Sequence, residues 1–222
     1  MGWKASLIVI HKPNRVGNQQ LLEELGFNNL SKIEDKTFEE IINPDDNRVY
    51  IGEYNNNLII CAPELPMQFF EDNESYVEHK FTQIFPNSEI CAIVLHSTVN
   101  LWGFSVTING KKVRAKAGSS DDGTFVDYGE PLPEELELLN GAIVDENGIR
   151  TYTDTILPDE IFTEDQVGEN FVFSIWTRYF DVELDGMEES LFETEFAGYS
   201  YGNVIMKNAE IKVGNKPWWK FW

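Results

Sequence analysis

The chain has 222 residues, of which 42% are hydrophobic and 25% are charged. These fractions are typical of a folded globular protein and exclude an intrinsically disordered chain. With 38 acidic and 17 basic residues, the formal net charge is −21. Such a charge repels phosphate backbones and anionic lipids, so nucleic acids and membrane surfaces are excluded as partners, whereas a basic protein would be attracted. The alternative role of the charge is solubility alone.

The two cysteines, Cys61 and Cys91, each lie within an apolar run. A thiol in such a run behaves as a small buried hydrophobe, which argues against a disulfide framework. The apolar run at residues 5–10 is shorter than the core of a signal peptide or a membrane span. We therefore expect a reduced, cytoplasmic protein.

The N-terminal segments predict a strand, one or two helices and a β-hairpin. A continuous apolar run at residues 4–10 predicts a strand that is buried on both faces. Leucines at helical spacing over residues 18–25, with a glycine directly after them, predict a helix with a left-handed C-cap. Residues 33–42 carry a second helical stripe. Residues 48–54 and 58–62 predict a hairpin, because the asparagines between them tolerate the positive φ of a tight turn.

The next segments predict a helix, a strand and a second hairpin. Apolar residues at helical spacing over 75–85 predict a helix with Ser75 as its N-cap. Residues 89–95 read as another buried strand. Residues 102–108 and 112–117 flank an Asn-Gly pair, which is the strongest short hairpin signal.

Beyond residue 118 the patterns are weaker. A hairpin is expected between residues 142–144 and 149–152, and residues 164–180 predict a helix from apolar residues at spacings of four. Three of the six tryptophans lie within residues 216–222. We expect this tail to fold back as a clasp over the core, because free aromatic tails invite aggregation. An exposed interaction patch is the alternative.

The order of elements over residues 1–95 is strand, helix, strand, strand, helix, strand. This is the order of the ferredoxin-like split βαβ fold. We therefore expect an α+β protein with a ferredoxin-like core (β-α-β-β-α-β), extended by a β-hairpin and an additional C-terminal helix. The chain is expected to form one domain, with its core at residues 1–118 and an extension at 119–222 packed on that core.

The topology decides which polar residues meet. In the ferredoxin-like order the first and last core strands are adjacent and antiparallel, which places Lys4 beside His96. A doubly wound parallel sheet would instead bring His11 and His96 to one edge, where such sheets bind ligands. The pair that meets therefore tests the fold.

Three groups of residues match the sequence motifs of a known family. They are Met1, Gly2 and Lys4; Leu95, His96, Ser97 and Val99; and Arg114 with Asp127, Gly129, Glu130, Pro131, Leu132 and Pro133. On these residues the chain resembles an uncharacterised bacterial family of unknown function. Asn100 stands where that family carries an acid. The resemblance implies no activity.

His96 and Ser97 follow a buried strand, where side chains emerge from a core. A serine beside a histidine can form a nucleophile–base pair. However, strand neighbours point to opposite faces, and the Gly-x-Ser-x-Gly motif is missing. The structural alternative is a strand-end histidine hydrogen-bonded to backbone. As a candidate ligand-binding group, Lys4, His96, Ser97 and Asn100 would suit an anionic ligand, and a solvated lysine is the alternative.

No cofactor or metal signature is present in the sequence. Its three histidines and two cysteines lack zinc-site spacing. The acidic segments at residues 121–123 and 145–148 lack the spacing of calcium loops and read as hairpin turns. No glycine-rich phosphate or dinucleotide motif occurs. We therefore expect no metal, cofactor or nucleotide.

These observations favour a non-catalytic binding or interaction protein, a monomer or weak homodimer. One version is an immunity-type protein whose acidic face blocks a basic toxin. The alternative is a small hydrolase or transferase that uses a site at Lys4, His96 and Ser97.

Overall fold

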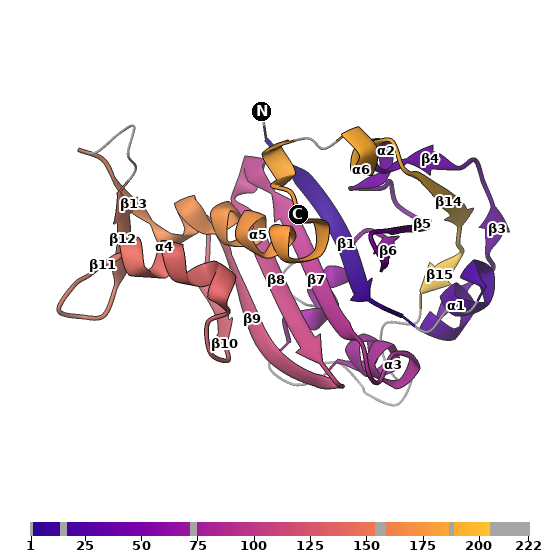
Figure 1. Cartoon of the computed structure of the whole chain (residues 1–222), viewed down its shortest axis with the longest axis horizontal. Helices are drawn as coiled ribbons and strands as arrows, with labels where there is room; N and C mark the ends of the chain where they lie inside the picture. Colours follow the sequence, from indigo (N-terminus) through magenta and orange to yellow (C-terminus); the bar gives the residue numbers. More distant parts are fainter. Residues whose placement is uncertain (1, 14–16, 72–74, 154–158, 187–188, 205–222) are drawn as a thin grey trace.

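The computed structural model describes residues 2–13, 17–71, 75–153, 159–186 and 189–204. The fold is α+β, and its centre is one large antiparallel sheet (Figure 1). The ten strands of this sheet are β1 (Lys4–His11), β3 (Ser31–Lys32), β4 (Lys36–Thr37), β5 (Arg48–Tyr54), β6 (Asn57–Cys61), β7 (Glu89–His96), β8 (Leu101–Ile108), β9 (Lys111–Ser119), β10 (Gly123–Tyr128) and β14 (Glu195–Ser200). Their order is β10-β9-β8-β7-β1-β6-β5-β14-β3, and β4 also pairs with β14.

The register of β1 against β7 tests the doubly wound alternative. Lys4 pairs with His96, and His11 pairs with Glu89 at the other end of the same antiparallel ladder. The prediction that residues 4–10 and 89–95 lie side by side and run in opposite directions is therefore confirmed. His11 and His96 lie at opposite ends of the ladder, which excludes the doubly wound parallel sheet.

Each face of the sheet is covered by different helices. Alternation along β1 sends Ile8 and Ile10 to one face, where α1 (Asn18–Leu25), α3 (Tyr76–Ile84) and the 3₁₀ helix η1 (Pro66–Phe69) pack. Leu7 and Val9 point to the other face, which is covered by α5 (Glu164–Phe180) (Figure 1). The site described below lies on the face of α1 and α3.

The helix boundaries agree with the sequence patterns. The α1 helix ends at Gly26, whose φ of 105° is the left-handed C-cap that was expected. Ser75 caps α3, because its hydroxyl oxygen accepts a hydrogen bond of 3.1 Å from the Glu78 backbone N–H. The predicted helix at residues 164–180 is α5. The tail at residues 216–222, for which a clasp was predicted, lies outside the described residues.

One expected helix is much shorter than predicted. The stripe at residues 33–42 gives only α2 (Phe38–Ile41). The residues before it form β3 and β4, which pair in turn with the two ends of β14. Hydrogen bonding to a strand far away in the chain thus replaces the helical bonds that the apolar spacing predicts.

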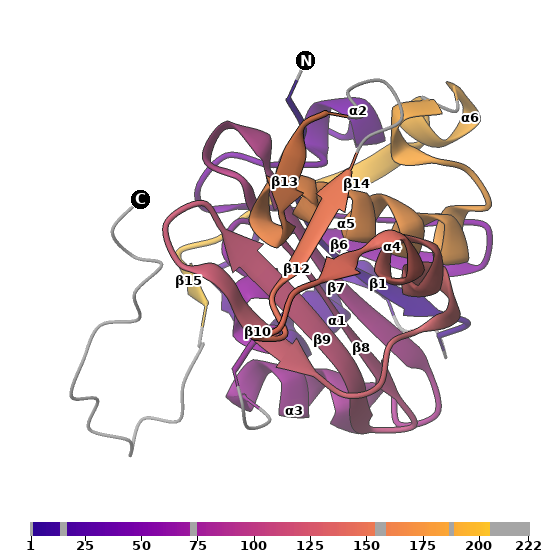
Figure 2. The same ribbon diagram turned by 90° about the vertical axis from the view of Figure 1, so that its left-hand side faces the viewer.

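The remaining elements surround this sheet. A small three-stranded sheet, in the order β11-β12-β13, lies at one end of the molecule in Figure 1 and faces the viewer in Figure 2. A two-stranded pair joins β15 to β2. These elements are β2 (Phe27–Asn28), η2 (Ser97–Val99), η3 (Pro133–Glu135), α4 (Leu136–Gly141), β11 (Ile143–Val144), β12 (Arg150–Thr153), β13 (Ile161–Thr163), η4 (Leu184–Gly186), α6 (Glu189–Phe192) and β15 (Asn203–Val204). None of the helices in the described part of the chain has the length and apolar composition needed to cross a bilayer.

Candidate functional site

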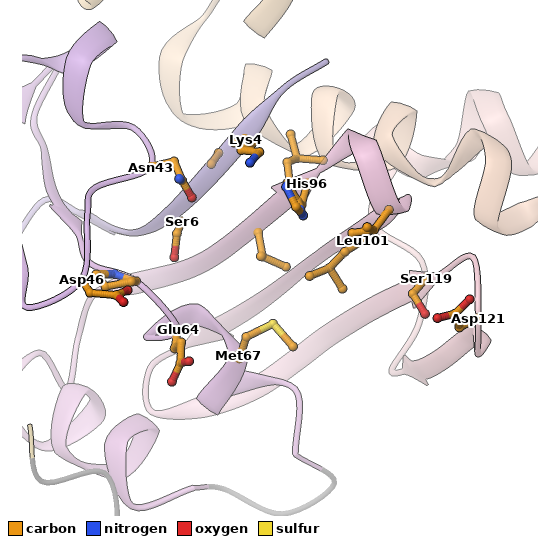
Figure 3. A pocket seen from close by; sticks show the side chains of 15 residues that line it. Lys4, Ser6, Asn43, Asp46, Glu64, Met67, His96, Leu101, Ser119 and Asp121 are labelled. Atoms are coloured by element: carbon orange, nitrogen blue, oxygen red, sulfur yellow. The ribbon is translucent and has the colours of Figure 1, made fainter. Parts of the chain in front are cut away.

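A cavity of about 440 Å³ opens at the end of the sheet where β1 begins and β7 ends (Figure 3). Its lining comes from these strands, η1, η2, β8, β9 and three loops. The lining residues are Lys4, Ala5, Ser6, Asn43, Asp46, Pro63, Glu64, Met67, Val94, Leu95, His96, Val99, Leu101, Ser119 and Asp121. The cavity therefore joins segments from both ends of the predicted 1–118 core with the first residues of the predicted extension.

The strand register explains why Lys4 and His96 both reach this cavity. They are direct partners across the β1–β7 ladder, and the next pair on the same face is Ser6 with Val94. Partners across an antiparallel ladder have Cβ atoms about 4.5–5.5 Å apart. Below them, Met67 of η1 and Val94 belong to a small buried apolar cluster that forms part of the cavity floor.

The His96 imidazole is half-buried and lines the cavity. Among the described residues it has no hydrogen-bond partner, so the expected bond to backbone is not seen there. Burial lowers the pKa of His96, and the positive charge of Lys4 lowers it further. The imidazole is therefore predominantly neutral at pH 7, with ring nitrogens that can donate to or accept from a ligand.

Ser97 and Asn100 do not join Lys4 and His96. The Ser97 hydroxyl accepts a hydrogen bond of 2.9 Å from the Trp3 backbone N–H and donates one of 2.8 Å to Glu169 Oε2 on α5. It therefore lies on the α5 face, as strand alternation requires. Asn100 is the C-cap of η2 with φ 46°, and it does not line the cavity.

The structure adds three acidic residues that the sequence analysis did not select: Asp46, Glu64 and Asp121. All three are exposed and follow or precede strands in loops, where no periodic pattern marks them. Asp46 and Glu64 lie on the same side of the cavity (Figure 3). Their negative charges also affect the neighbouring phenol of Tyr201. Burial of this phenol, together with the charges of the two acids, raises the pKa of Tyr201 to about 12.

The motif that begins at Arg114 forms a buried structural cluster away from this cavity. The Arg114 guanidinium is 1% exposed and donates to both carboxylate oxygens of Glu135, to the Asp127 carboxylate and to the carbonyls of Tyr128 and Gly129. Burial would lower the pKa of Arg114, but the bonds to Glu135 and Asp127 raise it above its usual value. The Asp-x-Gly-Glu-Pro-Leu-Pro run is therefore the peptide that encloses a buried arginine.

A second buried cation lies beside this cluster. Lys116 is 0% exposed, and its ammonium donates to Glu164 Oε1 at 2.6 Å and to Asp127 Oδ2 at 3.2 Å. Thr124 and Tyr152 also donate to the Glu164 carboxylate. Burial would raise the pKa of Glu164, but Lys116 outweighs it and holds that pKa below its usual value. Both interior cations are thus fully compensated by acids of the same chain.

The charged side chains of the cavity differ in this respect. The described residues form no ion pair or side-chain hydrogen bond with Lys4, Asp46, Glu64 or Asp121. Their charges are available to a ligand. Among those same residues, no group of three or more His, Cys, Asp and Glu side chains is arranged to hold a metal ion.

No curated protein and no solved structure matches the chain. A family model, described as a family of unknown function (DUF6928), matches residues 9–150. The match includes His96, the three cavity acids and the Arg114 cluster, whereas Lys4 and α5 lie outside it. Because the model covers more than half of the chain, the chain belongs to this family of unknown function, DUF6928.

Proposed function

We propose that this protein is a non-catalytic binding protein that holds a small molecule in the cavity beside Lys4 and His96. The observation that supports this proposal is the cavity itself. Its volume of about 440 Å³ falls within the range of about 300–1,000 Å³ that is usual for ligand sites. Its floor includes the apolar side chains of Met67 and Val94, and a few polar groups converge above them. This combination is the usual composition of a ligand pocket.

The alternative of a hydrolase or transferase at Lys4, His96 and Ser97 has less support. A nucleophile must lie within hydrogen-bond reach of its base, at about 2.6–3.2 Å. The Ser97 hydroxyl is instead engaged by Trp3 and Glu169 on the opposite face of the sheet from the His96 imidazole. The other serine near the ladder, Ser6, donates to the Ala62 carbonyl at 2.8 Å. Binding therefore accounts for the cavity better than covalent catalysis does.

A valine at the cavity provides the test. Val99 lines the cavity and is half-buried, and Val182 is a half-buried valine that packs with the core on the α5 side of the sheet and does not line the cavity. We expect a thermal-shift screen of amino acids, carboxylic acids, amines and sugars to give a ligand whose calorimetric affinity falls at least tenfold in Val99→Trp. In the control Val182→Trp the affinity should change less than twofold. Equal binding to both variants, or no ligand in the panel, would contradict the proposal.

The net charge of −21 supports a second candidate, in which an acidic face binds a basic protein, as an immunity-type protein would. Attraction between opposite charges accelerates association and is screened by salt, with a Debye length of about 8 Å at physiological ionic strength. We expect a basic partner captured from the native host at low ionic strength to associate at least tenfold more slowly when the salt concentration is raised well above the physiological value. Capture of no basic protein, or a salt-independent association rate, would count against this candidate.

We further propose a ferredoxin-like split βαβ unit formed by β1, α1, β5, β6, α3 and β7. The sheet order β7-β1-β6-β5, with antiparallel pairing throughout, supports it. So does the packing of α1 and α3 on one face. The two free, buried cysteines, Cys61 and Cys91, support a reducing compartment such as the cytoplasm.

A further inference from the structure

We propose that the ligand of the cavity is a cationic amino acid, whose carboxylate lies at Lys4 and His96 and whose side-chain cation lies at Asp46 and Glu64. This assignment rests on the proposed small-molecule binding function. It names the chemical class of the ligand from the arrangement of charge around the cavity.

The cavity has a basic end at Lys4 and His96 and an acidic end at Asp46 and Glu64, and the third acid, Asp121, lies apart from that acidic end, beside Ser119 (Figure 3). Lys4 and His96 lie together at the strand ends, and Asp46 and Glu64 lie together across the cavity from them (Figure 3). The pKa directions agree with this separation. The positive charge of Lys4 contributes to the lowered pKa of His96, whereas the negative charges of Asp46 and Glu64 contribute to the raised pKa of Tyr201. A ligand that satisfies both ends carries an anionic group and a cationic group on one molecule.

Part of the cavity floor is apolar, and the polar side chains of Ser6 and Asn43 lie beside it between Lys4 and Asp46 (Figure 3). Met67 is 5% exposed and Val94 is 7% exposed, and both line the cavity. An aliphatic chain that joins the two charged groups would cover these side chains and remove apolar surface from water. Cationic amino acids have such a chain.

The balance of charge favours a ligand with a net positive charge. The lining holds three carboxylates, those of Asp46, Glu64 and Asp121, against the single ammonium of Lys4. His96 adds hydrogen-bonding nitrogens but little charge at pH 7, because its pKa is lowered. A simple carboxylic acid would meet one cation and three acids within a chain of net charge −21, so an added cationic group is needed to make the field attractive.

Three probes of similar shape separate the two ends. Arginine carries both charged ends, agmatine is arginine without the carboxylate, and citrulline replaces the guanidinium with a neutral urea. We expect calorimetry to show arginine binding about tenfold more tightly than either analogue, since hydrogen bonds to a charged group contribute the most. Equal affinity for the three probes would overturn the assignment.

Variants assign each end of the ligand to its side chains. Lys4→Gln should weaken arginine binding about tenfold and leave agmatine unchanged, and Glu64→Gln should weaken arginine and agmatine but leave citrulline unchanged. Glu130→Gln removes an exposed acid outside the cavity and should change none of the three affinities. The reverse pattern, or equal losses for all probes, would contradict the proposed orientation.

The failure of this inference can be told from failure of the binding function. If arginine does not bind but another member of the screening panel does, and Val99→Trp abolishes that binding, the cavity is a ligand site and the amino-acid class is wrong. If no panel member binds, both proposals fail. Binding of arginine that Val99→Trp does not change would place arginine elsewhere and would also overturn the inference.

Discussion

Replacement of Glu135 by alanine is expected to lower the free energy of unfolding by about 3–5 kcal/mol. Glu135 is 0% exposed and holds the Arg114 guanidinium through both carboxylate oxygens. It also accepts the Leu132 backbone N–H at 2.8 Å. Removal of the carboxylate leaves a buried cation with Asp127 as its only remaining acidic partner in the described cluster. Urea denaturation followed by circular dichroism measures the loss.

Two further variants show whether the loss comes from the orphaned charge. Glu137→Ala removes an exposed acid on the neighbouring helix α4 and should change stability by less than about 0.5 kcal/mol. Arg114→Met combined with Glu135→Leu removes both charges and should recover much of the loss, because apolar replacements of a buried ion pair are often tolerated. A cost below about 1 kcal/mol for Glu135→Ala would show that the pair is not essential to the fold.

Gly168→Ala in α5 is expected to destabilise the protein by about 1–3 kcal/mol, although glycine to alanine normally stabilises a helix. A Cβ at Gly168 would lie 1.9 Å from Cε2 and Nε1 of Trp102. Trp102 is 1% exposed on β8, so its indole has little room to move. Either the helix or the indole must shift, and the midpoint of urea denaturation should fall.

A matched glycine and a matched tryptophan variant test this steric explanation. Gly141 ends α4, and a Cβ there would meet nothing within 4 Å, so Gly141→Ala should leave stability unchanged or slightly higher. Trp102→Phe makes room for the added methyl group. It also loses no hydrogen bond to the described residues, because Trp102 Nε1 has none there. If Gly168→Ala is as destabilising in the Trp102→Phe background as in the unaltered protein, the indole is not the cause.

Local patterns predicted the parts of the fold that local interactions determine. The double-sided strand at residues 4–10 and the helix at residues 164–180 appear as β1 and α5, because buried strands and amphipathic helices leave a clear period in the sequence. The pairing of β1 with β7 followed from the order of the elements, and that order alone placed Lys4 beside His96.

The rest depends on contacts between distant segments. β3 and β4 have two residues each, and they are strands only because β14 supplies their hydrogen-bond partners. At the site, strand alternation correctly anticipated that Ser97 would point away from His96. Asp46, Glu64 and Asp121 lie in separate loops, and only the folded sheet brings them to one cavity. No spacing in the sequence could reveal that convergence.

The position of β14 in the sheet also bears on how the chain is made. β5 pairs with β6 on one side and with β14 on the other, so one of its two hydrogen-bonding edges is completed by residues 195–200. During synthesis on the ribosome, that edge stays open until those residues have been translated, and an open edge invites pairing with other nascent chains. Completion of this side of the molecule therefore cannot precede the synthesis of residues 195–200.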